Sequence, residues 1–189
     1  HEKHWKETYD GLTPDSKTLM VSLGGFQSNN DYRGWFRILT ENHIPFNVIS
    51  IGRLDKIDLS DYKALVLPNV PYLSDSAIKV VDDFVKKGGT LIADGETGFY
   101  DETYESRGES GLKSLGISRI RSIRNDMASA MLEVNDKTDM PHMADRDLVY
   151  FGDSFVYADY EESAVGTTRL IPPHWVGPPE RCYWTQETE

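Results

Sequence analysis

The sequence predicts an α/β protein built on a parallel, doubly wound sheet with flavodoxin-like strand order. Short apolar segments alternate with amphipathic helical segments through the first half of the chain, which favours right-handed β-α-β crossovers. Each apolar segment stops at glycine, proline or a polar turn, as buried parallel strands do. The expected strands are residues 17–23, 46–51, 64–67 and 90–93.

The first predicted helix follows the polar loop 27–30, which offers N-cap side chains. Its apolar residues recur at i, i+3, i+4 and i+7, which makes one stripe for the core. The residues of this stripe are Tyr32, Trp35, Phe36 and Leu39. Gly34 costs this helix about 1 kcal/mol relative to alanine, and close packing against a strand would explain its presence.

The second predicted helix begins after Ser74, which is an N-cap residue, and stops at Gly88-Gly89, where a left-handed turn is expected. Its pattern assigns one face to the core and one to solvent. The expected buried residues are Ala77, Ile78, Val81, Phe84 and Val85. The expected exposed residues are Asp82, Asp83, Lys86 and Lys87.

The second half of the chain is less regular. A short helix capped by Gly116 is expected at 111–116, and a strand that includes Ile120 and Ile123 should follow. Residues 127–134 fit a helix or a strand equally well. The remaining expectations are a hairpin of 148–151 with 155–157 through Gly152-Asp153, a strand at 166–171 and a proline-rich surface loop at 172–179.

These patterns predict three parts in the chain. Residues 1–16 form a linker from a preceding domain, 17–171 form the α/β domain and 172–189 form a proline-rich loop and tail. Within the α/β domain, 117–171 are the less regular and β-rich portion. Because the chain begins at His1 and ends without a clear structural element, we expect it to be a piece of a longer polypeptide.

Composition excludes several classes of function. The net charge of −11 argues against a nucleic-acid or anionic-membrane binder, which needs a basic face. No apolar run reaches the roughly 20 residues that span a bilayer. The single Cys182 excludes an intramolecular disulfide and a cysteine-based metal cluster. Localisation stays open between the cytoplasm and a secreted or periplasmic compartment.

Two carboxylates directly follow the fourth predicted strand, at the edge where α/β proteins place ligands. Asp94 and Glu96 could form an acid/base pair of the kind used in glycoside hydrolysis. The alternative interpretation, which we favour, is that they accept hydrogen bonds from backbone N–H groups of the turn. No GxSxG elbow is present, and Ser154 lies too late in the chain for a lipolytic motif.

Other candidates are weaker. Asp139, His142 and Asp145 come closest to metal-ligand spacing, but such a polar loop is more often plain surface, so we expect no metal and no cofactor. His174-Trp175, between proline pairs, is the best candidate for an aromatic contact with a partner or a sugar. Arg107, among several acids, is a further candidate ligand or interface residue.

Residues 17–120 resemble the middle domain, or trimerisation domain, of β-galactosidase-like glycoside hydrolases (family 42 and relatives). The resemblance depends on the order and spacing of several segments over half the chain. These are 31–39 (DYRGWFRIL), 44–49 (IPFNVI), 62–70 (YKALVLPNV), 84–93 (FVKKGGTLIA), 95–101 (GETGFYD) and 111–116 (GLKSLG).

This resemblance implies the three-layer α/β sandwich of class I glutamine amidotransferases. Those enzymes carry a Gly-x-Cys-x-Gly elbow after a strand like 90–93, which would place the cysteine near Gly95. Since the only thiol is Cys182, amidotransferase chemistry is not expected. In the family the domain is non-catalytic, follows a TIM barrel that holds the catalytic carboxylates, and contributes to trimer contacts.

The expected function is therefore that of an accessory or oligomerisation domain of a multidomain glycoside hydrolase, with the barrel outside these residues. Its partners would be other domains of the same polypeptide, further copies in a homo-oligomer such as a trimer, and the parent's carbohydrate substrate. Two alternatives stay open. The chain could be an independent small hydrolase that uses Asp94 or Glu96, or a sugar-binding module.

Overall fold

The computed structural model describes residues 15–23, 30–127, 129–138, 140–152, 154–176 and 183–186. The chain divides into two compact units, His1–Arg119 and Ile120–Glu189. This division falls inside the range 17–171 that the sequence predicts as one domain, and the extent of that domain stays a prediction. Most of the predicted linker 1–16 lies outside the described residues.

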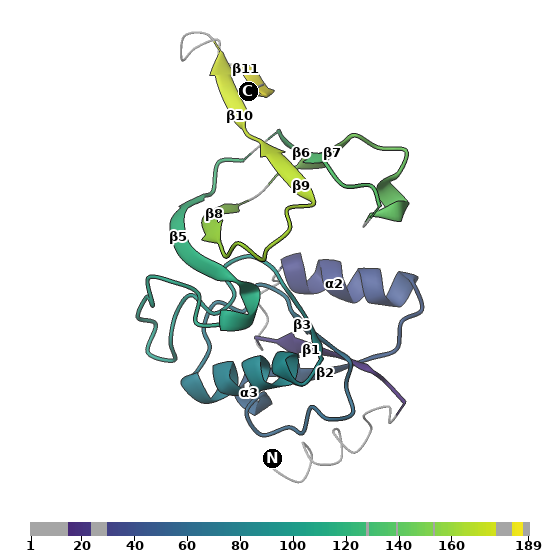
Figure 1. Cartoon of the computed structure of the whole chain (residues 1–189), viewed down its shortest axis with the longest axis vertical. Helices are drawn as coiled ribbons and strands as arrows, with labels where there is room; N and C mark the ends of the chain where they lie inside the picture. The colour runs from purple at the N-terminus through teal and green to yellow at the C-terminus, as the bar shows by residue number, and fades with distance from the viewer. Residues whose placement is uncertain are drawn as a thin grey trace. The chain divides into compact units, whose positions relative to one another are not determined.

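The first unit contains the predicted parallel sheet (Figure 1). Its strands pair in the order β2-β1-β3-β4, which is the flavodoxin-like order. The register places Thr18 opposite both Phe46 and Ala64, and Ala64 opposite Thr90. The strands are β1 (Thr18–Ser22), β2 (Phe46–Ser50), β3 (Ala64–Leu67) and β4 (Thr90–Ala93).

Two helices complete three layers, with α2 (Asn30–Glu41) and α3 (Asp75–Lys86) on opposite faces of the sheet (Figure 1). Alternate strand residues enter separate cores. Met20 and Val66 pack with Leu39 of α2, whereas Leu19, Val21, Leu65 and Leu67 pack with Ala77, Val81 and Phe84 of α3. The predicted three-layer α/β fold is confirmed, and each fully buried Leu or Val stabilises it by about 1.5–3 kcal/mol.

Helix α2 uses its predicted stripe unevenly. Leu39 is buried and Trp35 half-buried, but the ring of Phe36 is 45% exposed. The prediction of close packing at Gly34 is wrong, because a Cβ there would meet nothing within 4 Å. Gly34 faces away from the sheet, on the side of the helix roughly opposite Leu39.

Helix α3 has the predicted ends. The Ser74 hydroxyl accepts a hydrogen bond from the Ala77 N–H at 3.2 Å, and Gly88 has a φ of +94° after the last turn. The prediction that Asp82 is exposed is wrong, since only 8% of it is accessible. Its carboxylate accepts hydrogen bonds from the N–H groups of Lys113 (3.4 Å) and Ser114 (3.0 Å).

A returning loop explains the burial of Asp82. The short 3₁₀ helix η2 (Lys113–Leu115) packs on α3, and its first N–H groups need an acceptor that its own turn does not supply. Gly116 ends η2 with a φ of +63°, as predicted for a glycine cap. A second 3₁₀ helix, η1 (Ile51–Arg53), follows β2.

The second unit is β-rich. β6 (Ala130–Val134) resolves the helix-or-strand ambiguity as a strand, because β7 (Leu148–Phe151) and β9 (Thr168–Ile171) pair antiparallel with it on its two sides. β5 (Ile117–Arg124) crosses the division between the units and pairs with β8 (Phe155–Tyr160). The 3₁₀ helix η3 (Pro141–Met143) precedes β7.

The predicted hairpin of 148–151 with 155–157 is wrong. These segments are β7 and β8, and they belong to different sheets, β7-β6-β9 and β5-β8. Each strand satisfies its backbone groups on a partner distant in sequence, so the turn through Gly152 connects sheets instead of closing a hairpin.

Within the proline-rich loop predicted at 172–179, residues 173–176 instead form one strand of a two-stranded antiparallel ladder, and residues 177–179 lie outside the described part of the chain. β10 (Pro173–Val176) pairs with β11 (Tyr183–Gln186), with Trp175 opposite Trp184. Both strands of such a ladder have an open edge, which is where proline, lacking an N–H group, is tolerated. Among the described residues no helix is long and apolar enough to cross a membrane.

Candidate functional site

The carboxyl edge of the parallel sheet brings together the loops after β3 and β4 and the start of α2. Sites in doubly wound folds form at this edge. Asp94 follows β4, Asn69 follows β3 and Trp35 lies on α2, and hydrogen bonds join all three. Asp31, at the start of α2, also bonds to Asn69. We call Asp31, Trp35, Asn69 and Asp94 the edge network.

Asp94 is held by two donors from other parts of the chain. Its Oδ1 accepts from the Asn69 N–H at 2.5 Å and its Oδ2 accepts from Trp35 Nε1 at 2.6 Å. Burial raises the pKa of Asp94, the two hydrogen bonds oppose that rise, and the negative charge of Asp31 adds to it. A raised pKa suits an acid catalyst, but here both oxygens already serve as acceptors within the fold.

Asn69 is the centre of the network and has a φ of +42°. Its Nδ2 donates to Asp31 Oδ2 at 3.0 Å, and its Oδ1 accepts from the Glu96 N–H at 3.0 Å. One amide thus joins the loop after β4 to the start of α2. This role of Asn69 is absent from the sequence predictions, although an asparagine in the turn just after a buried strand, where positive φ is tolerated, is a usable signal.

Gly95 is where the sequence predicts the counterpart of the amidotransferase elbow cysteine. Its φ of +58° is the left-handed conformation that a nucleophile elbow requires. A Cβ built there would lie 2.5 Å from both Cγ and Oδ1 of Asn69. The backbone thus makes a left-handed turn after β4, and the Asn69 amide fills the space that a side chain at Gly95 would need.

Glu96 is directed to a different partner. Its Oε2 accepts from the Tyr100 hydroxyl at 3.1 Å, and this bond and the charge of Glu96 raise the pKa of Tyr100. The carboxylates of Asp94 and Glu96 therefore accept from different donors.

Arg107 joins two segments of the first unit. Its Nη2 donates to the Leu73 carbonyl at 2.9 Å and lies 2.8 Å from Asp75 Oδ1 at the start of α3. The side chain is 21% exposed, so most of it is covered by the fold. These contacts favour a bracing role for Arg107 over ligand binding.

The remaining candidates are less defined. The backbone of His174 and Trp175 lies in β10, but their side chains, and all of Asp139 and Cys182, fall outside the described residues. Within the described part of the chain, no group of three or more His, Cys, Asp or Glu side chains is placed to hold a metal ion.

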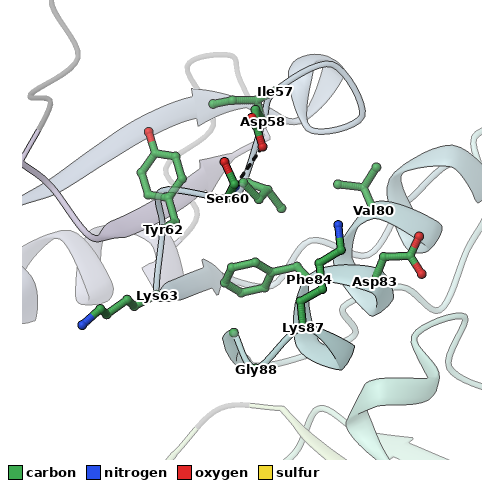
Figure 2. A pocket seen from close by; sticks show the side chains of 12 residues that line it. Ile57, Asp58, Ser60, Tyr62, Lys63, Val80, Asp83, Phe84, Lys87 and Gly88 are labelled. Carbon is green, nitrogen blue, oxygen red and sulfur yellow. Dashed lines mark hydrogen bonds between the residues drawn. The ribbon is translucent and has the colours of Figure 1, made fainter.

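A pocket of about 540 Å³ opens at the opposite, amino-terminal edge of the sheet (Figure 2). Leu59 and Phe84 contribute apolar surface, and charges of both signs surround it. In Figure 2 the Lys87 side chain extends toward Val80, whereas that of Lys63 points away from Phe84. The charged residues that line it are Asp58, Lys63, Asp83 and Lys87. This mixture selects neither anions nor cations.

Residues 12–164 match the family described as the β-galactosidase trimerisation domain. Among curated protein sequences, none matches this chain.

Several solved structures share the fold. A β-galactosidase from Bacillus circulans sp. alkalophilus matches with a TM-score of 0.69 and 17% identity, over 87% of this chain and 26% of that one. A β-galactosidase from Rahnella sp. R3 gives 0.66 and 16%, over 82% and 25%. An α-L-fucosidase isoenzyme 2 from Paenibacillus thiaminolyticus gives 0.65 and 17%, over 95% and 27%. The chain thus spans about a quarter of each of these proteins.

Proposed function

Because the chain belongs to the β-galactosidase trimerisation domain family, we propose that it is the non-catalytic assembly domain of a β-galactosidase-like glycoside hydrolase. The catalytic barrel of that parent would lie outside these 189 residues. Membership of the family implies contacts with further copies of the chain or with other domains of the same polypeptide. A trimer, and a galactoside as the parent's substrate, are parts of the proposal.

The hydrogen bonds and packing within the edge network support the proposal that the domain is non-catalytic. An elbow nucleophile needs a side chain at Gly95, and Asn69 occupies that space at 2.5 Å. The two oxygens of Asp94 accept hydrogen bonds from Trp35 and from the Asn69 N–H, which hold the carboxylate within the fold. The edge where the fold places a site is thus filled by its own side chains.

Sedimentation of the full-length parent tests the assembly role. We expect deletion of residues 17–171 to lower the mass of the parent from an oligomer to a monomer. The parent that carries Asp94→Asn and Glu96→Gln is the matched control and should keep the oligomer. An unchanged mass after the deletion would overturn the proposal.

A further inference from the structure

Three tyrosines gather on the surface beside the edge network, in the loops that follow β3 and β4. Tyr72 and Tyr104 pack edge to face with ring centroids 4.7 Å apart, and Tyr72 and Tyr100 are 5.4 Å apart. Tyr104 is 71% exposed and Tyr72 is 39% exposed. We call Tyr72, Tyr100 and Tyr104 the tyrosine platform.

The loop that carries Tyr104 is braced from within. Asp101 Oδ1 accepts hydrogen bonds from the N–H of Thr103 (2.8 Å), the hydroxyl of Thr103 (2.7 Å) and the N–H of Glu105 (3.0 Å). The Asp101 N–H donates to the Glu105 carbonyl at 3.0 Å. The ring of Tyr104 is therefore presented by an ordered turn.

Tyr104 has a backbone conformation that its side chain disfavours. Its φ is +68°, a region that bulky residues rarely adopt. A glycine or asparagine would fit this turn more easily, and neither would present a ring to solvent. Strain at an exposed aromatic residue supports a functional hypothesis for that residue.

Several acidic residues share the loop after β4 with Tyr100 and Tyr104. Glu102 and Glu105 are exposed on either side of Tyr104, and Glu96 accepts a hydrogen bond from the Tyr100 hydroxyl. The one cation of this loop, Arg107, is paired with Asp75. The surface thus combines an apolar ring face with several hydrogen-bond acceptors and negative charge.

We propose that the tyrosine platform binds a neutral carbohydrate, with a sugar ring stacked on Tyr104 and its hydroxyl groups donating to the neighbouring carboxylates. Aromatic faces bind the C–H surface of sugars, and ionised carboxylates accept strong hydrogen bonds from hydroxyl groups. The same charges repel an anionic sugar. A protein contact fits less well, because the centres of protein interfaces are depleted in charged residues.

Calorimetric titration of the 189-residue chain tests the platform. The probes are neutral tetrasaccharides of galactose, glucose and mannose, and the same compounds with their C6 hydroxyls oxidised to carboxylates. We expect at least one neutral compound to bind, and its oxidised form to bind at least about tenfold more weakly. No binding by any neutral compound, or equal binding of the oxidised form, would overturn the proposal.

Variants locate the site. Tyr104→Ala should weaken binding roughly tenfold, and Tyr104→Phe should stay within about twofold, because the ring face is retained. Tyr160→Ala is the control, since Tyr160 is a similarly exposed tyrosine (58%) outside the platform. Equal loss with Tyr160→Ala would contradict the assignment.

A different outcome separates this inference from the assembly role. If no sugar binds and Tyr104→Ala lowers the sedimentation mass of the full-length parent, the platform is a protein contact and the carbohydrate inference is wrong, while the assembly role stands. If Tyr104→Ala abolishes sugar binding but leaves the sedimentation mass of the parent unchanged, the carbohydrate inference holds. It then holds whatever the deletion of residues 17–171 does to the mass.

Discussion

The edge network and the tyrosine platform lie a few residues apart at the carboxyl edge of one sheet. The side chains of the first form hydrogen bonds within the fold, whereas Tyr72 and Tyr104 of the second are exposed to solvent. In the edge network, the Asp94 carboxylate accepts hydrogen bonds from the Asn69 N–H and from Trp35, and the Asn69 side chain bonds to Asp31 and to the Glu96 N–H. In the platform, the Tyr104 ring is held in solvent. The position of a loop in a fold therefore does not establish a site, because what matters is whether its atoms remain available for a ligand.

The largest expected effect is the filling of Gly95. Gly95→Ala should lower the free energy of unfolding by about 3 kcal/mol, from the left-handed φ and the overlap with Asn69. Urea denaturation measures it. Gly34→Ala is the matched control and should raise stability by about 0.5–1 kcal/mol, since its Cβ meets nothing within 4 Å. If Gly95→Ala left the free energy of unfolding unchanged, Asn69 could not be filling the space beside Gly95.

Removal of the charge of Asp94 should have the next largest effect. Asparagine can accept only one of the two hydrogen bonds and turns its amide hydrogens toward the other donor, so Asp94→Asn should cost about 1–3 kcal/mol. The same unfolding measurement near pH 7 checks this value. Stability equal to that of the wild type would mean that the edge network does not hold the loops together.

The pH dependence of that difference has a defined sign. Because the folded pKa of Asp94 is raised by burial, its folded state binds the proton more tightly than the unfolded chain does. The stability that this adds is present below the unfolded pKa and is lost as pH rises through the folded pKa. The gap between wild type and Asp94→Asn should therefore narrow as pH rises through that window. A gap that widens would exclude the raised pKa.

The smallest expected effect belongs to the platform. Tyr104→Gly should change stability by no more than about 0.5 kcal/mol, because the exposed ring contributes little burial and glycine relieves the positive φ. Thermal unfolding of the variant measures it. A loss as large as that of Asp94→Asn would show that the platform is a structural element like the edge network.

The parallel sheet could be predicted because its signals are local. Each strand is a short apolar run closed by a turn residue, and Ser74 and Gly88 mark the ends of α3 within a few residues of sequence. The position of Asp94 at the sheet edge followed from the same pattern. Its partners did not, because Trp35 and Asn69 are 59 and 25 residues away.

Other misses have a similar cause. Asp82 has the sequence of an exposed helix residue, and only the return of residues 113–114 makes it a buried acceptor. β7 and β8 have strand composition, but composition does not choose between neighbouring and distant partners. Trp35 belongs to the predicted apolar stripe, but its indole N–H also needs an acceptor, which is Asp94.

An assay of glycoside hydrolysis tests whether this chain is non-catalytic. The purified 189-residue chain and the full-length parent that carries Glu96→Gln are compared on an aryl β-galactoside. We expect no turnover by the chain and a kcat/KM for the parent variant equal to that of the unmodified parent. If the 189-residue chain hydrolysed the aryl β-galactoside, and the same chain with Glu96→Gln did not, the non-catalytic role would be contradicted.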